Sequence, residues 1–254
     1  MVRVEVITSL KEFIRHIEDS LELSLGPRWF RGAGDYSHTL TPSLFRHPDV
    51  ISGTLNPIEL EGRVIARFKQ TSPPFLNAPP VTPLDWMFMA QHFGVPTRLL
   101  DWSENPFIAL YFALSTSKGS NMPCVWLLDP LLWTKKSLSN DNLPRIPDPA
   151  DTATVRFIES LTDDLAPRTD PIAIYSNHTN PRIVAQRGTF SMFGRGLTAM
   201  EKTPYAKDCL TCLLISDSAK QDLFKKLLSI GYTHSVIYPD LSGLGSELKT
   251  SFGF

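Results

Sequence analysis

Residues 91–113 read QHFGVPTRLLDWSENPFIALYFA, and this stretch decides the fold. Gly94 and Pro96 are typical of the end of a helix, which we expect to begin near Pro83. The next residues, 97–102, have the apolar pattern of a strand, and Asn105-Pro106 is a helix start. Histidine, arginine and aspartate stand within this mainly apolar stretch, and burying them costs free energy unless they are paired. The stretch therefore predicts a functional site.

Patterns outward from this stretch predict a mixture of helices and short strands. Helices are expected over about 9–25, 56–72 and 218–229. Strands are expected over 28–33, 124–129, 171–175, 182–185, 189–193, 209–215 and 233–238. Because the strands are short and unevenly spaced, we predict an α+β fold with a mixed or split β-sheet and flanking helices. The polar, proline-rich segment 137–151 is predicted to be a loop that borders a cleft.

Composition is typical of a globular protein with one large core. The 254 residues are 42% hydrophobic and 20% charged, and the net charge is −1. No global electrostatic field therefore attracts nucleic acid or an anionic membrane. The longest apolar runs are too short to span a bilayer, and the first residues lack a signal-peptide pattern. We expect a single domain over 1–254, a cytoplasmic location and no membrane association.

The three cysteines predict neither a disulfide framework nor a metal site. Cys209 and Cys212 have the spacing of a metal or redox motif, but no second Cys/His pair lies near them. The apolar residues around them are typical of a buried strand. We predict a structural role for Cys209 and Cys212, and no metal.

Several polar residues each allow a binding role and a structural role. Arg31 follows Phe30 and precedes Gly32, so its guanidinium either binds a phosphate or carboxylate, or pairs with Asp101 or Asp35. Arg98 and Asp101 are three residues apart in an extended segment, so they face opposite sides and should not pair. Asp101 either lines a cleft or caps the following helix.

Three further residues carry similar alternatives. His92 is either a core histidine or a general acid–base group. Gln186 either faces a ligand or belongs to an exposed turn before Gly188. Asp240 either caps the last helix or supplies a carboxylate to the site.

Four motifs in order resemble the FRG domain family, which is named after the triplet seen here at 30–32. The motifs are Trp29-Phe-Arg-Gly32, the stretch 91–113, Arg182-x-x-x-Gln-x-Gly-x-Phe190 and Tyr238-Pro-Asp-Leu-Ser-Gly243. The resemblance implies one FRG-like domain over 1–254, with an N-terminal helix at about 9–25 and a motif-bearing core at about 28–248. It also implies a bacterial or phage-borne protein linked with anti-phage defence or toxicity.

A weaker resemblance is to the ADP-ribosyltransferase fold. It matches Arg31 to the arginine that braces the nicotinamide cleft, 97–103 with 109–113 to a strand that runs into a helix, and 182–191 to a later catalytic strand. The position expected for the catalytic glutamate falls near Asn180 and Arg182, where no glutamate stands. NAD is the cofactor that this resemblance implies.

The candidate site residues follow from these resemblances and from the interpretations of the polar residues given above. The catalytic candidates are Arg31, His92, Arg98, Asp101 and Gln186. The cofactor-binding candidates are Phe30, Arg31, Gly32, Thr97, Arg98, Tyr111 and Arg182.

Three functions remain open at this point. The first is an NAD-using, ADP-ribosyltransferase-like effector acting on a protein or nucleic-acid acceptor. The second, which the missing glutamate favours, is a module that binds a nucleotide or nucleic acid without chemistry. The third is a protein-interaction module that acts through the loop at 137–151.

Overall fold

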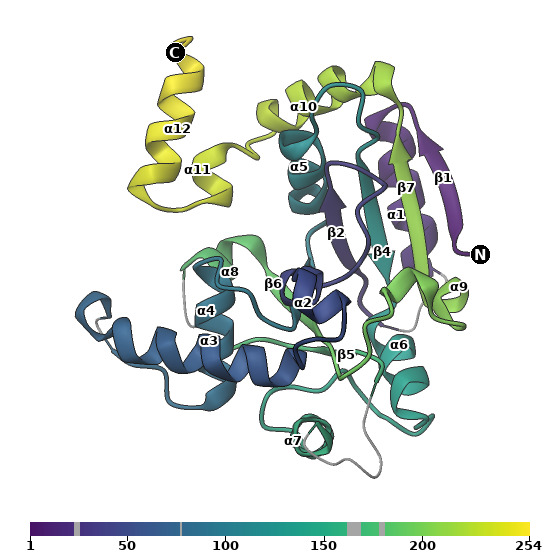
Figure 1. Cartoon of the computed structure of the whole chain (residues 1–254). Helices are drawn as coiled ribbons and strands as arrows, with labels where there is room; N and C mark the ends of the chain where they lie inside the picture. The colour runs from purple at the N-terminus through teal and green to yellow at the C-terminus, as the bar shows by residue number, and fades with distance from the viewer. Residues whose placement is uncertain (23–25, 77, 162–168, 178–180) are drawn as a thin grey trace.

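Seven strands of the computed structural model form one open sheet in the order β1-β7-β4-β2-β3-β6-β5 (Figure 1). The structure describes residues 1–22, 26–76, 78–161, 169–177 and 181–254. The strands are β1 (Arg3–Ile7), β2 (Trp29–Ala33), β3 (Leu99–Ser103), β4 (Cys124–Leu128), β5 (Ile172–Ile174), β6 (Gly188–Met192) and β7 (Leu210–Ile215). β1 pairs parallel to β7, and the other neighbouring pairs are antiparallel. The predicted mixed α+β fold is confirmed.

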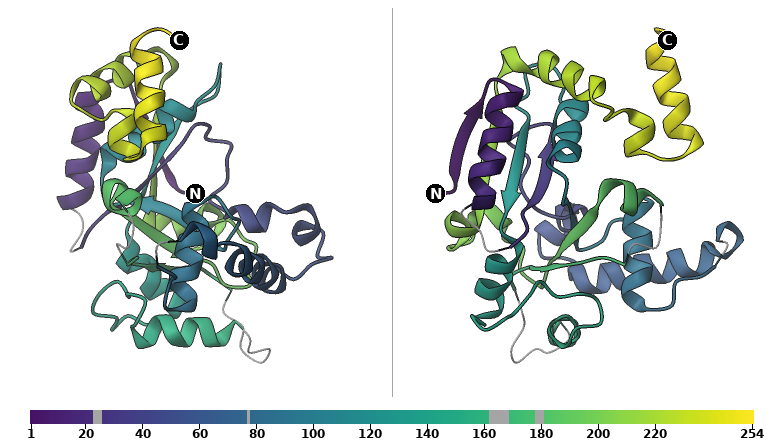
Figure 2. Two further views of the ribbon diagram at one scale, coloured as in Figure 1. Left: turned by 90° about the vertical axis from the view of Figure 1, so that its left-hand side faces the viewer. Right: turned by 180° about the vertical axis from the view of Figure 1, so that it is seen from behind.

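The helices surround the sheet on both faces (Figures 1 and 2). The α-helices are α1 (Leu10–Glu22), α2 (Pro48–Ile51), α3 (Pro57–Thr71), α4 (Pro83–His92), α5 (Pro106–Thr116), α6 (Pro130–Leu138), α7 (Thr152–Ser160), α8 (Pro181–Gln186), α9 (Ala206–Cys209), α10 (Lys220–Ser229), α11 (His234–Ile237) and α12 (Leu241–Ser251). Short 3-10 helices are η1 (Ser43–Arg46), η2 (Pro73–Phe75), η3 (Met200–Lys202) and η4 (Asp217–Ala219). Within the described residues, no helix combines the length and the apolar character needed to cross a bilayer.

The sheet is almost divided in two between β2 and β3. β2 pairs with β4 along its whole length, but it pairs with β3 only where Phe30 meets Ser103. β3 in turn pairs with β6 along its whole length. We call β1, β7, β4 and β2 the long sector, and β3, β6 and β5 the short sector. Beyond the single pair, the two sectors diverge.

Each face of the long sector has its own core. On one face, Phe30 of β2 and the neighbouring apolar residues of β4 and β7 pack against α1, α5 and α10. The right-hand view of Figure 2 shows α1 in front of these strands. On the other face, Trp29 and Trp126 pack with η1, α6 and α9, and Trp102 of β3 joins the same cluster. A third cluster joins the short sector to α4 and α7.

Most predicted elements are present, with two errors of type. Segments 182–185 and 233–238, predicted as strands, contain the short helices α8 and α11. Their β-branched residues suggested strands, but Pro181 is suited to a first helical turn and Pro239 ends the second helix. The elements β1, α6 and α7 were not predicted. The predicted helix 9–25 ends at Glu22 in the described chain, and residues 23–25 lie outside the described residues.

Candidate functional site

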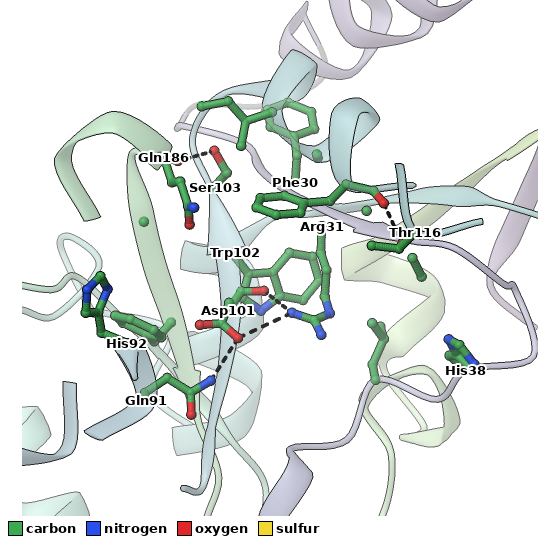
Figure 3. Close-up of a pocket in the computed structure, with 18 of the residues that line it drawn as sticks. Phe30, Arg31, His38, Gln91, His92, Asp101, Trp102, Ser103, Thr116 and Gln186 are labelled. Carbon is green, nitrogen blue, oxygen red and sulfur yellow. Dashed lines mark hydrogen bonds and ion pairs between the residues drawn. The ribbon is translucent and has the colours of Figure 1, made fainter. Parts of the chain in front are cut away.

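A pocket of about 1150 Å³ lies at the divergence of the two sectors (Figure 3). β2 and β3 supply its centre, α4 and α8 one side, and α5 with the 33–40 segment the other. The residues that carry its chemistry are Arg31, His38, Arg46, Gln91, His92, Asp101, Trp102, Ser103, Thr116, Arg182 and Gln186. The loop at 137–151, which was predicted to border a cleft, contributes no lining residue.

Arg31 and Asp101 meet across the opening. Arg31 Nη1 donates to the backbone oxygen of Asp101 at 2.6 Å and lies 3.8 Å from Asp101 Oδ2. The Asp101 side chain is 56% exposed, whereas that of Arg31 is 26% exposed. The alternative in which Arg31 pairs with Asp101 therefore holds, and this pair still faces the pocket.

A chain of hydrogen bonds that begins at the buried Thr97 fixes the orientation of Asp101. The Thr97 hydroxyl accepts from the Leu99 backbone N–H at 3.1 Å and donates its own proton to Gln91 Oε1 at 2.7 Å. Gln91 Nε2 then donates to Asp101 Oδ2 at 2.8 Å. Among the described residues, no group donates to Asp101 Oδ1. One carboxylate oxygen is thus anchored, and the other is available to a ligand.

The local sequence explains this arrangement. β3 alternates, so Asp101 points away from the face that carries Leu100 and Trp102. Gly94, with φ +76°, ends α4 one residue after its C-cap and turns the chain toward Thr97. Gln91 in the last turn of α4 is therefore brought against β3.

The pocket carries an excess of positive charge. Arg31, Arg46 and Arg182 line it, against the single carboxylate of Asp101. Burial lowers the pKa of Arg31 from its ordinary value, and Asp101 opposes that shift. Because arginine has so high an ordinary pKa, Arg31 stays charged. Such a site attracts an anion.

His92 lies half-buried at the α4 side of the pocket, so it is not a core histidine. Burial lowers its pKa, the positive charge of Arg182 lowers it further, and Asp240 acts in the opposite direction. Arg182 itself packs over the ring of Tyr238, with 4.6 Å between the guanidinium carbon and the ring centroid. His92 is therefore neutral at pH 7 and available as a proton acceptor.

Gln186 and Asp240 show that the C-terminal segment supports the pocket. Gln186 Nε2 donates to the backbone oxygen of Ile237, and its own backbone oxygen accepts from the Ser103 hydroxyl. The Asp240 side chain accepts from the Gly243 N–H as the N-cap of α12. The capping alternative for Asp240 is confirmed.

Gly32 serves the packing of α5. A Cβ atom at this position would lie 1.9 Å from the backbone oxygen of Ala109. The helix that follows β3 therefore lies directly on β2, and a side chain at 32 would separate them. Gly32 lines the pocket only through its backbone.

Three predicted site residues lie away from the pocket. Arg98 is buried and binds Glu61 through a side-chain ion pair, with Nε to Oε2 at 2.6 Å. As predicted, it does not pair with Asp101. Thr97 is fully buried and acts through Gln91. The Tyr111 hydroxyl contacts His234 Nδ1 at 2.9 Å, and Tyr111 belongs to the core that packs against α1, α5 and α10.

Sequence reasoning missed Arg46, His38, Trp102 and Phe93, all of which line the pocket. Phe93 is 63% exposed although it is aromatic. A single sequence does not show that an apolar residue at the end of a helix is exposed and lines a pocket. Arg46 and His38 belong to an irregular segment whose path is set by tertiary contacts.

The three cysteines lie in the apolar core. Cys124, Cys209 and Cys212 are free and buried. Across the described parts of the chain, no group of three or more His, Cys, Asp or Glu side chains is placed to hold a metal ion.

One protein family matches part of the chain. The family model described as "FRG domain" matches residues 27–122. This segment is an FRG domain. It includes β2, α4, β3 and α5, so the FRG domain supplies Arg31, Gln91, His92 and Asp101. Neither the curated proteins nor the solved structures gave a match to the chain.

The two later motifs, at 182–190 and 238–243, lie beyond the matched residues. The structure nevertheless brings Arg182 and Gln186 to the same pocket as the FRG motifs. The resemblance to ADP-ribosyltransferases predicted a catalytic strand over 182–191. The structure corrects this, because Arg182–Gln186 is helical and only Gly188–Met192 is a strand. Asn180, where the glutamate was sought, lies outside the described residues.

Proposed function

We propose that the pocket binds NAD and that the protein cleaves the bond between nicotinamide and ribose, as in the ADP-ribosyltransferases that it resembles. The pocket combines aromatic walls with three arginines, which suits a ligand that carries both flat rings and phosphates. Its volume of about 1150 Å³ accommodates a dinucleotide.

The half-anchored carboxylate of Asp101 is the observation that carries this proposal. Its Oδ2 is held by Gln91 and lies near Arg31, so Oδ1 is presented in one direction. An oriented carboxylate can accept a hydrogen bond from a ribose hydroxyl and stabilise positive charge on the ribose as nicotinamide leaves. In this proposal Asp101 takes the part of the missing glutamate. Water or an acceptor group forms the new bond to the ribose carbon as nicotinamide leaves, and neutral His92 accepts its proton.

A second candidate function is nucleotide binding without cleavage. It is favoured by one observation, that the residues which line the pocket include no glutamate. The same arginines and aromatic rings would then hold the ligand, and Asp101 would serve only to orient Arg31.

The test is calorimetric titration with NAD, followed by measurement of released nicotinamide. Wild type should bind and release, Arg31→Ala should lose both, and Asp101→Asn should keep most of the binding while release falls at least about a hundredfold. Arg156→Gln, which removes an exposed charge on α7, is the matched control. Binding with no release in wild type would support the second candidate, and no binding at millimolar NAD would exclude the first.

The family resemblance extends the proposal to a bacterial setting, in which the protein acts as a toxic or anti-phage effector. An NAD-consuming effector should slow growth and lower cellular NAD when it is overproduced in bacteria. Asp101→Asn, made at the same level, should restore both. Equal toxicity of the two forms would contradict this role.

A further inference from the structure

We infer that Trp102, Arg31 and Arg46 form a subsite for a phosphoryl group, on the η1 side of the pocket. The inference rests on the proposed ligand site and deepens it, because it places the negatively charged part of the ligand. It begins from an unpaired donor. Trp102 is 3% exposed, and no acceptor for its Nε1 exists among the described residues.

A buried indole N–H without an acceptor is costly, so a bound acceptor is an expected partner. The Nε1 atoms of Trp29 and Trp126 are also unpaired among the described residues. Neither of these residues lines the pocket, whereas Trp102 does. The position of Trp102, and not the lack of an acceptor alone, points to a ligand.

Arg31 lies on the same sheet face as Trp102. The only pair between β2 and β3 is Phe30 with Ser103, so Arg31 and Trp102 follow it on the two diverging strands and point to one side. Both side chains lie at the centre of the pocket in Figure 3. Arg31 uses only Nη1 toward Asp101, and none of the described groups accepts from its Nε or Nη2.

Arg46 adds a second guanidinium at this end. It donates through Nη1 to the Thr41 backbone oxygen at 2.8 Å, which holds the side chain at the pocket wall. The described residues offer no acceptor to its Nε and Nη2. Its charge is close enough to Arg31 to act on the ionisation of that group. Two like charges held in one pocket are stabilised when an anion binds between them.

The combination of donors selects a phosphoryl group. Two guanidinium groups offer bidentate donors, and the indole N–H offers one more, so three oxygens on one centre are matched. Asp101 does not compete for these donors, because it receives only Nη1 of Arg31 and is held by Gln91. Arg182, on α8, belongs to the opposite side of the pocket.

The test is calorimetric titration of the full chain with inorganic pyrophosphate. We expect Trp102→Phe, which keeps the ring and removes the N–H, and Arg46→Gln each to weaken binding by about tenfold. Arg156→Gln should leave the affinity unchanged. Arg46 is exposed, so its variant tests the subsite even if Trp102→Phe fails to fold.

Three outcomes decide the inference. Loss of affinity in both folded variants, with competition between pyrophosphate and NAD, would support the subsite. No binding of pyrophosphate to wild type at millimolar concentration, or equal affinity in wild type and Arg46→Gln, would overturn it. If pyrophosphate binds as expected but NAD is neither bound nor cleaved, the subsite stands and the proposed function fails.

Discussion

At the scale of single residues, Gln91 connects the protein interior with the pocket. Its amide oxygen accepts a hydrogen bond from the Thr97 hydroxyl, and its amide nitrogen donates one to Asp101. Because the Asp101 carboxylate can only accept, Gln91 Nε2 must face it, and Gln91 Oε1 is left to accept from the Thr97 hydroxyl. Sequence reasoning named Asp101 and Thr97 as site residues but not Gln91. It assigned Thr97 to the ligand, since spacing alone cannot show which side chain is buried.

Removing the Thr97 hydroxyl should free the Gln91 amide. We expect Thr97→Val to lower the free energy of unfolding by about 1–2 kcal/mol, because the Leu99 N–H and Gln91 Oε1 both lose a partner. Thr97→Ser keeps the hydroxyl and should lose less than half of that. Urea unfolding measures both, and equal losses in the two variants would contradict the role of the hydroxyl.

The ionisation of His92 should depend on Arg182. Burial is the main cause of the lowered pKa and Arg182 the second, so Arg182→Gln should raise the pKa of His92 without restoring its ordinary value of about 6.5. NMR titration of the His92 ring measures this, with Arg156→Gln as control.

The same shift sets the sign of a pH effect on stability. His92 binds a proton more readily in the unfolded chain than in the folded protein. Above about pH 6.5 it is neutral in both states and does not lower the free energy of unfolding. As the pH falls from there toward the lowered folded pKa, protonation of the unfolded chain reduces the free energy of unfolding. Arg182→Gln should weaken that pH dependence. An unchanged His92 titration in this variant would show that the two groups do not interact.

At the scale of elements, the closest packing is that of α5 on β2. Local signals predicted both elements, because Asn105-Pro106 caps the helix and the aromatic pair Trp29-Phe30 is typical of a strand. Local signals failed for α8 and α11, where tertiary contacts select a helical turn over the strand that β-branched residues favour. They also missed β1, whose pairing with β7 joins residues about 200 positions apart along the chain.

Substituting Gly32 should separate α5 from β2. Gly32→Ala places a methyl group 1.9 Å from the Ala109 backbone oxygen, so we expect a loss of about 3 kcal/mol or more in unfolding free energy. Gly62→Ala, inside α3 with open space around it, should instead stabilise the protein by about 0.5–1 kcal/mol. Denaturant titration compares the two, and a tolerated Gly32→Ala would contradict the close approach.

At the scale of the whole molecule, the site belongs to neither sector alone. Arg31 comes from the long sector and Asp101 from the short one, and only the Phe30–Ser103 pair joins the two strands directly. The predicted α+β class, with a mixed or split sheet and flanking helices, is confirmed as a fold with one mixed sheet. The sequence could not show that the split itself forms the pocket, because this depends on where β2 stops pairing with β3.

A ligand in the pocket should therefore stabilise both sectors together. At a concentration of about 100 times its Kd, NAD should add about 2.7 kcal/mol to the free energy of unfolding. Hydrogen exchange should slow in β2 and β4 and equally in β3 and β6. Protection confined to one sector would show that the ligand does not bridge the opening.

The buried cysteines give the protein a built-in reporter of opening. Burial raises the pKa of Cys209 to about 12. A hydrogen bond with Cys124, together with burial, raises the pKa of Cys212, so both thiols are protonated and shielded in the folded chain. Cys124 and Cys212 lie on β4 and β7, and Cys209 directly precedes β7. A thiol reagent can therefore react with these cysteines only after the long sector opens. The rate of alkylation, followed by mass spectrometry, would time that opening in the unmodified protein.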